Sequence, residues 1–304
     1  MSERITVGIP VVRELAALHL AVRSVFAQTH EDWKLLIVCD GSPPEVVQAA
    51  RAIRSPRVEV VADGASRGLA ARLNQITALA DTRLVARMDA DDLMHPTRLQ
   101  RQLAYFREHP SVDVVATGAW VIDDVGVVQG MNRDPGVPSL PAGYLGSTVF
   151  CHPSVVFTRE WSLRYPYSPD WVRTEDKELW LRSQAGSSFA RIADPLIFYR
   201  IARSPDAAKQ ALTYRFDRRL MREYWRKVGA TRAEWLRQDL RSRGKQMLLP
   251  VARATGQTGN AYGRKFLPAP HGEMVRAQDV VAKIETTRVS GWDDGDVILE
   301  ESRR

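Results

Sequence analysis

Short apolar, β-branched segments alternate with longer segments of helical spacing over the first 118 residues. Runs of strand length occupy residues 4–10, 33–41, 57–62, 83–89 and 111–118. Between them, apolar residues recur every three or four positions, as in 15–26 and about 68–80, which is typical of amphipathic helices. We expect Ser42 to cap a further helix and Pro96 to begin another. These repeated β–α units predict an α/β fold with a mostly parallel sheet flanked by helices.

The rest of the chain has a different pattern. Shorter strands follow residue 118, with a hairpin expected around 123–126. Two helices are expected between about 206 and 249, the first with apolar residues at intervals of four: Leu212, Phe216, Leu220 and Tyr224. Beyond Pro250 the Gly, Pro and charge content rises, so we expect the tail to be only partly ordered. The sequence therefore predicts an α/β domain over 1–205 and a basic helical extension over 206–304 with a partly irregular tail.

Composition places the chain among ordinary globular proteins, with 44% hydrophobic and 26% charged residues. Cys39 and Cys151 are far apart and lie outside any metal or redox spacing, so we expect reduced, buried thiols. The N-terminal stretch lacks the apolar core of a signal peptide, and no run reaches the roughly 18 apolar residues of a membrane span. We therefore expect a cytoplasmic protein.

Acidic residues follow two of the expected strands. Asp40 ends the second strand, and "DADD" places Asp89, Asp91 and Asp92 directly after the fourth. Ligands of open α/β sheets bind outside the carboxyl ends of the strands, so these acids favour one shared site. Alternation along a strand puts Asp89 and Asp91 on one side, with Asp92 pointing away unless the chain turns. Two close carboxylates suit Mg²⁺ or Mn²⁺ with substrate phosphates, although such acids could also simply lead into the helix expected at Pro96.

A second acidic group lies in "RTEDKELWLRS". Glu175 and Asp176 occupy the first turn of an expected amphipathic helix that carries Leu179, Trp180 and Leu181. Acids in a first turn commonly do no more than complement the helix dipole. The pair therefore gains a chemical interpretation only in combination with the other segments.

Several segments together resemble family 2 glycosyltransferases of the GT-A fold, over roughly residues 4–203. They occur in the order "ITVGIPVV", "SVFAQTHEDWKLLIVCDGSPP", "SRGLAARLNQITALA", "RLVARMDADDLMHPTRLQRQL", "CHPSVVFTRE", "TEDKELWLR" and "PLIFYRI". The resemblance implies a Rossmann-like GT-A sheet. It also implies an inverting, metal-dependent hexosyltransferase that moves a sugar from a nucleotide diphosphate sugar, with UDP favoured, to an acceptor hydroxyl.

The resemblance also assigns roles to residues. Asp176 would be the general base, Asp91 the principal metal ligand, and Asp89 a contact to both metal and ribose, with Mn²⁺ or Mg²⁺ as the cofactor. The other residues that it implies for donor binding are Pro10, Val11, Val12, Glu14, Asp40, Arg72, Ala90, Glu175, His152 and Arg200. His152 could equally be a structural histidine, and Arg200 could form an ordinary salt bridge.

Positive charge is concentrated late in the chain. Between residues 200 and 253 there are fifteen Arg and Lys against five Asp and Glu. The interleaved aromatic residues are Tyr214, Phe216, Tyr224, Trp225 and Trp235. These helices could contact a membrane that carries a lipid-linked acceptor, pack on the catalytic domain, or form a homodimer.

Two rival functions remain open at this stage. A nucleotidyltransferase would also need metal-binding acids on an α/β sheet, but it gives no reason for a separate Glu-Asp base. A non-catalytic protein that binds membrane or nucleic acid would explain the net charge of +7 and would not depend on Asp91. We favour the glycosyltransferase, with a nucleotide sugar and a glycan, lipid-linked or small-molecule acceptor as partners and no nucleic acid.

Overall fold

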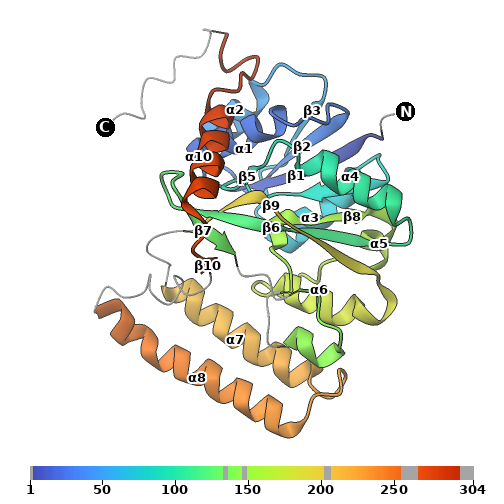
Figure 1. Cartoon of the computed structure of the whole chain (residues 1–304), viewed down its shortest axis with the longest axis vertical. Coiled ribbons are helices and arrows are strands. Elements are labelled where there is room, and N and C mark those ends of the chain that lie inside the picture. Colours follow the sequence, from blue (N-terminus) through green and yellow to red (C-terminus); the bar gives the residue numbers. More distant parts are fainter. Residues whose placement is uncertain (1–2, 133–135, 146–148, 202–206, 255–265, 295–304) are drawn as a thin grey trace.

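A computed structural model describes residues 3–132, 136–145, 149–201, 207–254 and 266–294. A mixed ten-stranded sheet runs through the described chain in the order β10-β7-β6-β8-β4-β1-β2-β3, with β9 beside β6 and β5 beside β9. Helices cover both faces of this sheet, and the pair α7 and α8 lies at one end of the molecule (Figure 1). The predicted α/β fold is confirmed.

Four parallel strands form the half of the sheet that the β–α pattern predicted. Their order is β3-β2-β1-β4, and every neighbouring pair is parallel. The bounds are β1 Ile5–Val11, β2 Trp33–Cys39, β3 Val58–Ala62 and β4 Leu84–Arg87. All residues of β4 and all but one of β1 and β2 are buried, because helices pack on both faces.

The other half of the sheet is mostly antiparallel. Strand β8 is inserted between β4 and β6 and runs antiparallel to both, so the expected β–α alternation ends before 111–118. The predicted hairpin at 123–126 joins β6 to β7. The bounds are β5 Leu93–Met94, β6 Val114–Ile122, β7 Val128–Asn132, β8 Val156–Thr158 and β9 Phe189–Arg200.

Two groups of helices bury the two faces of the sheet. One face packs against α1 Leu15–Phe26, α2 Pro44–Arg51 and α4 Arg98–Glu108. The opposite face packs against α3 Leu69–Leu79, α5 Arg159–Arg164 and α6 Glu175–Ser183. Short 3-10 helices lie at Pro141–Leu145 (η1), His152–Ser154 (η2) and Gln184–Gly186 (η3). Both predicted cysteine thiols are free and buried.

Two predicted helix starts are wrong. Helix α2 begins at Pro44 after Pro43, and the Ser42 hydroxyl instead donates to the carbonyl oxygen of Val11 at 2.8 Å. A proline at the first helical position needs no capped amide, which leaves Ser42 free for this contact. Helix α4 begins at Arg98 rather than at Pro96, because strand β5 and a turn intervene.

The C-terminal part forms a helical hairpin and then returns to the sheet. The two predicted helices are α7 Ala207–Tyr224 and α8 Arg232–Ala254. The expected irregular tail contains β10 Phe266–Leu267, which pairs with β7, and the helix α10 His271–Glu285. Helix α10 buries Ala277, Val281 and Ile284 in a small core with β6 and β7. The sequence does not predict this helix, because the Gly, Pro and charge content beyond Pro250 is typical of irregular structure.

No helix in the described part of the chain is both long enough and apolar enough to span a bilayer.

Candidate active site

Three loops meet at the carboxyl edge of the parallel strands. The loop after β1 is tied to the end of β2, because the Asp40 amide donates to the carbonyl oxygen of Val11 at 2.8 Å. The acidic turn after β4 lies near the same loop, since the charge of Glu14 raises the pKa of Asp91. The predicted residues Pro10 and Val12 lie in or beside this loop, and Val12 is 41% exposed. One site therefore contains the segments that the sequence placed at this edge.

The three acids after β4 form one cluster. A turn in which the Asp92 amide donates to the Asp89 carbonyl oxygen at 3.4 Å follows the strand. Carboxylate oxygens of Asp89, Asp91 and Asp92 lie within 4.8 Å of one another. Asp92 therefore does not point away from the other two, and it lies too far before Arg98 to begin helix α4. The predicted Ala90 is buried inside the turn.

Negative charge in this cluster is only partly compensated. Burial and the charge of Asp89 raise the pKa of Asp91 to about 6. Burial and the charges of Asp91 and Asp89 raise the pKa of Asp92 well above its ordinary value. The Oδ2 atom of Asp92 has no hydrogen-bond partner. A divalent cation prefers carboxylate oxygens and would remove the repulsion between them. The donor set therefore fits Mg²⁺ or Mn²⁺.

Arg200, at the end of β9, fixes the acidic turn from the side. Its amide donates to Oδ1 of Asp92, and its Nε donates to the carbonyl oxygen of Asp91, both at 2.8 Å. Its Nη1 donates to the carbonyl oxygens of Asp123 and Asp124, while Nη2 is buried without a partner. These side-chain contacts go to backbone oxygens, so the alternative of an ordinary salt bridge does not describe this residue.

Arg87 is a site residue that the sequence reasoning missed. It lies on β4, is 2% exposed, and donates from Nη2 to Oδ1 of Asp89 at 2.5 Å. Burial alone would lower its pKa, but charges from both acidic groups, Asp89 and Glu175 among them, raise it. Its charge also lowers the pKa of Asp176 against the effect of burial. The positive charge of Arg87 therefore interacts with both acidic groups. The one feature of the sequence that could have identified Arg87 is its place two residues before Asp89.

The Glu-Asp pair occupies the first turn of α6, as predicted. Burial and the charge of Asp176 raise the pKa of Glu175 to about 7, and burial raises the pKa of Asp176. Thr174, immediately before the helix, has a φ of 63° and is the only non-glycine residue with positive φ among those the structure describes. A β-branched residue rarely adopts this conformation, and such strain is concentrated at functional sites. The backbone at Thr174 therefore sets the orientation of the helix turn that carries both carboxyl groups, and its positive φ costs conformational energy.

Helix α7 holds α6 in place. Lys177 pairs with Asp217 at 2.7 Å, and the Tyr224 hydroxyl donates to Oε1 of the buried Glu178 at 2.6 Å. Trp171, just before α6, packs against Phe216 with ring centroids 5.9 Å apart. Phe216 and Tyr224 therefore pack on the catalytic domain, as one of the three sequence alternatives proposed.

His152 lies beneath the site and away from solvent. It is 8% exposed, its Nε2 lies 2.8 Å from the Tyr167 hydroxyl, and its ring packs edge-on against Trp180. Burial and the charge of Arg87 hold its pKa well below the ordinary value, so the ring is neutral. These contacts favour the structural interpretation of His152.

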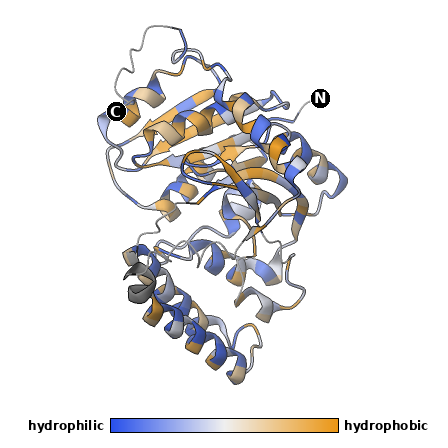
Figure 2. Cartoon of the chain, turned by 60° about the vertical axis from the view of Figure 1, so that its left-hand side comes forward, coloured by the Kyte–Doolittle hydropathy of each residue, from blue (hydrophilic) through white to orange (hydrophobic). Residues whose placement is uncertain are grey.

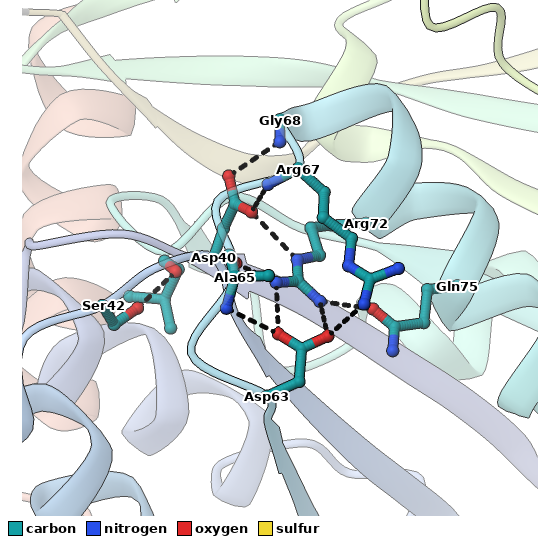
Figure 3. Close-up of polar contacts among 9 residues, drawn as sticks. Asp40, Ser42, Asp63, Ala65, Arg67, Gly68, Arg72 and Gln75 are labelled. Atoms are coloured by element: carbon teal, nitrogen blue, oxygen red, sulfur yellow. Dashed lines mark hydrogen bonds and ion pairs between the residues drawn. The ribbon is translucent and has the colours of Figure 1, made fainter.

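Asp40 and Arg72 form a closed network instead of an open binding surface (Figure 3). The Asp40 carboxylate accepts hydrogen bonds from the amides of Arg67 and Gly68 and from Nε of Arg72, at 2.6, 3.0 and 2.9 Å. The Arg72 side chain is fully buried and also pairs with Asp63 at 2.7 Å. Both residues thus shape the loop 63–68, and their predicted contacts with the nucleotide stay predictions.

Comparisons with known proteins identify the family. Residues 6–162 match the family described as glycosyl transferase family 2. EpsE from Bacillus subtilis, a glycosyltransferase by name, is 30% identical over 210 residues, which cover 66% of this chain and 74% of EpsE. The O-antigen biosynthesis glycosyltransferase WbnJ from Escherichia coli is 24% identical over 203 residues, which cover 64% of this chain and 78% of WbnJ.

Solved structures share the fold. Residues 1–349 of S. aureus TarS superpose with a TM-score of 0.58 at 16% identity, covering 79% of this chain and 71% of that one. The mannosyltransferase PcManGT from Pyrobaculum calidifontis, in complex with GDP-Man and Mn²⁺, also has a TM-score of 0.58 at 16% identity, covering 93% and 81%. The sequence match extends over most of the sheet and includes the acidic turn. The chain therefore belongs to glycosyl transferase family 2, and it is a glycosyltransferase.

Proposed function

We propose that this enzyme transfers a sugar from a nucleotide diphosphate sugar to an acceptor hydroxyl with inversion at the anomeric carbon. The observation that carries the proposal is the pairing of two acidic groups with different surroundings. One is a three-carboxylate cluster with excess negative charge, and the other is a carboxyl pair at a strained helix start. The positive charge of Arg87 interacts with acids of both groups. A single displacement needs both functions at once: stabilisation of the leaving diphosphate on one face of the sugar and deprotonation of the acceptor hydroxyl on the other.

The donor would bind with its diphosphate at the acidic turn. Asp89 and Asp91 would hold a divalent metal ion, which supplies Lewis-acid stabilisation of the departing diphosphate. The Nη2 atom of Arg200 has no hydrogen-bond partner, and it would donate a hydrogen bond to a diphosphate bound beside the same turn. The loop Pro10–Glu14 would contact the nucleoside. A UDP-sugar is our first candidate, on the family resemblance and on TarS, which shares the fold and has been solved with UDP and with UDP-GlcNAc; a GDP-sugar is the second, because PcManGT has been solved with GDP-Man.

Asp176 would take the proton from the acceptor hydroxyl. A base must be ionised, and burial raises the pKa of Asp176 and so increases the proton affinity of its carboxylate. Attack from the face opposite the diphosphate gives inversion, as for other carboxylate-assisted displacements at an anomeric carbon. The acceptor would be a glycan, a lipid-linked sugar or a small molecule. O-antigen biosynthesis in the name of WbnJ supports the first two classes.

Two measurements test this function. Titration calorimetry with a panel of nucleotide sugars should show donor binding that needs Mn²⁺ or Mg²⁺, and equal binding in chelator would reject the metal site. Asp176→Asn should keep that binding but lose nucleotide release in the presence of candidate acceptors by roughly 10²–10⁴-fold. The matched control is Asp170→Asn, which changes an exposed acid just before the same helix. Unchanged turnover in Asp176→Asn would remove Asp176 from the mechanism.

A further inference from the structure

Helix α8 exposes an apolar stripe at the end of the molecule farthest from the sheet (Figure 1). Four of its large apolar side chains are open to solvent: Leu236 is 48% exposed, Leu240 59%, Met247 76% and Leu248 63%. Hydropathy along the helix alternates sharply between polar and apolar positions (Figure 2). Scattered exposed apolar residues are normal, but three of these four recur on one side of the helix and form a patch.

The stripe faces away from the rest of the protein. Leu236, Leu240 and Met247 are separated by four and seven residues, which places them on one side of a helix with 3.6 residues per turn. Trp235 and Ser242 lie on another side, where Trp235 packs against Trp225, just after helix α7, and Ser242 donates to the carbonyl oxygen of Tyr214 on α7. The stripe is therefore not needed for the hairpin to pack.

Basic residues flank the stripe on both sides. Helical geometry places exposed Arg232 and Arg243 on one side of the stripe, and exposed Arg237 and Arg241 on the other. Both acids in the described part of the helix are already engaged. Glu234 accepts hydrogen bonds from the amide and hydroxyl of Thr231, and buried Asp239 pairs with Arg243 at 2.6 Å. The surface thus combines an apolar centre with a basic rim.

We propose that this face of α8, defined by Leu236, Leu240 and Met247, binds an anionic membrane surface. Apolar side chains would enter the interface between lipid headgroups and chains while Arg and Lys contact the lipid phosphates. A second copy of the chain fits less well, because a twofold contact would bring two basic rims together. Nucleic acid would satisfy the rim but would leave the apolar centre without a partner.

The surface differs from the one that the sequence indicated. The aromatic residues that the sequence offered for a lipid contact pack inward instead, since Tyr224 bonds to Glu178 and Trp225 faces Trp235. The outward side chains are aliphatic. Because Lys177 on α6 pairs with Asp217 on α7, a membrane bound at α8 would have a fixed position relative to the first turn of α6. An acceptor embedded in that membrane would then approach Asp176 from a defined direction.

Co-sedimentation of the full-length protein with vesicles tests the proposal. Vesicles of phosphatidylcholine alone and with about 30% phosphatidylglycerol are the probes, since anionic lipid should increase binding at physiological salt. Two variants probe the two components of the surface, Leu240→Asp/Met247→Asp for the stripe and Arg232→Gln/Arg237→Gln/Arg241→Gln for the rim. Each should lower binding to anionic vesicles at least fivefold.

Matched controls carry the same charge changes elsewhere. Leu163→Asp/Val275→Asp places two new acids at exposed apolar positions on α5 and α10. Arg51→Gln/Arg107→Gln/Lys283→Gln removes three exposed cations from other helices. Both controls should bind vesicles like the unchanged protein, and all variants should bind donor normally because none changes the active site.

Three results would overturn the proposal. Binding that ignores anionic lipid content would be one, and an equal loss in the charge-matched controls would show that only net charge matters. Light scattering that detects a dimer which Leu240→Asp/Met247→Asp dissociates, without vesicle binding, would assign the stripe to a second copy.

Discussion

Two acidic clusters lie at the same edge of the sheet and differ in how their charge is balanced. Asp40 and Asp63 surround the buried guanidinium of Arg72, and hydrogen bonds from Arg72 and from the Ala65 amide hold the pKa of Asp63 far below its ordinary range. Asp91, by contrast, has its pKa raised to about 6 by burial and by Asp89. The first cluster is neutralised within the chain, whereas in the second Arg87 pairs with Asp89 alone and we propose that a divalent cation balances the rest.

Asp40 stabilises a loop at the edge of the site, whereas Asp91 is proposed to bind the metal ion. Both clusters follow parallel strands, and the family resemblance implies donor binding for Asp40, Asp89 and Asp91. Of these two clusters, as far as the structure describes them, the one around Asp91 contains a buried carboxylate oxygen, Oδ2 of Asp92, without a hydrogen-bond partner. Four predictions test this difference, from the largest expected effect to the smallest.

Asp91→Asn should lower turnover by roughly 10³-fold, because a metal ligand at the leaving diphosphate is lost. The melting temperature in chelator should stay the same or rise by a few degrees, because the substitution removes like-charge repulsion within the cluster. Nucleotide-release assays and thermal melts measure the two effects. Asp81→Asn, at an exposed acid paired with Lys34, is the control and should keep full activity.

Arg72→Met should lower the free energy of unfolding by about 3–5 kcal/mol, because Asp40 would be left buried without its cation. Arg67→Met is the control, since Arg67 is exposed and its pair with Asp63 should contribute less than about 1 kcal/mol. Urea unfolding measures both. If Arg72→Met kept normal stability but lost donor binding, Arg72 would belong with the residues that contact substrate.

Stability in chelator should fall as pH rises from about 4 to 7. A carboxyl group whose pKa is raised on folding holds its proton in the folded state after the unfolded chain has lost it, so each pH step in this window favours unfolding. Asp91, with a pKa of about 6, and Glu175, with one of about 7, act in this direction. After allowance for solvent screening the Asp91 contribution is roughly 1 kcal/mol.

Urea unfolding at pH 5 and pH 7.5, with chelator and with Mn²⁺, measures this dependence. Mn²⁺ should remove most of the loss attributable to Asp91, because the metal binds the ionised carboxylates. Asp91→Asn in chelator should show a smaller fall than the unchanged protein. A stability that rises through this window in chelator would contradict the raised pKa of the cluster.

Thr174→Gly should change stability by less than about 1 kcal/mol, because relief of the positive φ offsets the entropy that glycine loses on folding. Turnover should fall a fewfold, since the turn that directs Glu175 and Asp176 becomes more flexible. The control is Thr158→Gly at the start of α5, where φ is −70° and the hydroxyl accepts from the Trp161 amide. That variant should lose about 1 kcal/mol of stability with little effect on activity.

Much of the fold could be predicted because its signals are local. Period-two and period-3.6 patterns located β1 to β4 and helices α1, α3, α7 and α8 to within a few residues. Helix α2 was also expected, but its start was misplaced because Ser42 bonds across the sheet to Val11 instead of capping. Helix α10 was not predicted, because the Gly, Pro and charge content beyond Pro250 outweighed its own apolar spacing.

The acidic residues of the candidate site could be predicted from the sequence, but the cations that pair with them could not. The Asp89–Asp92 turn and the Glu175–Asp176 pair could be found as motifs. Arg87 could not be singled out, because an arginine in an apolar strand acquires significance only from the acids that the fold brings to it. The roles of Asp91 and Asp176 remain predictions that the experiments above would test.

The sequence by itself determined the β–α order, the acidic turn at the end of β4 and the family, since each depends on residues adjacent in the chain. Tertiary structure decided which acids are neutralised. Arg72 reaches Asp40 from 32 positions away, whereas the three carboxylates around Asp91 have a single pairing cation among the described residues, Arg87. It also decided which face of α8 stays exposed, because only packing against α7 selects the buried side. Charge balance and exposure both arise from contacts between distant segments, and a linear pattern does not contain them.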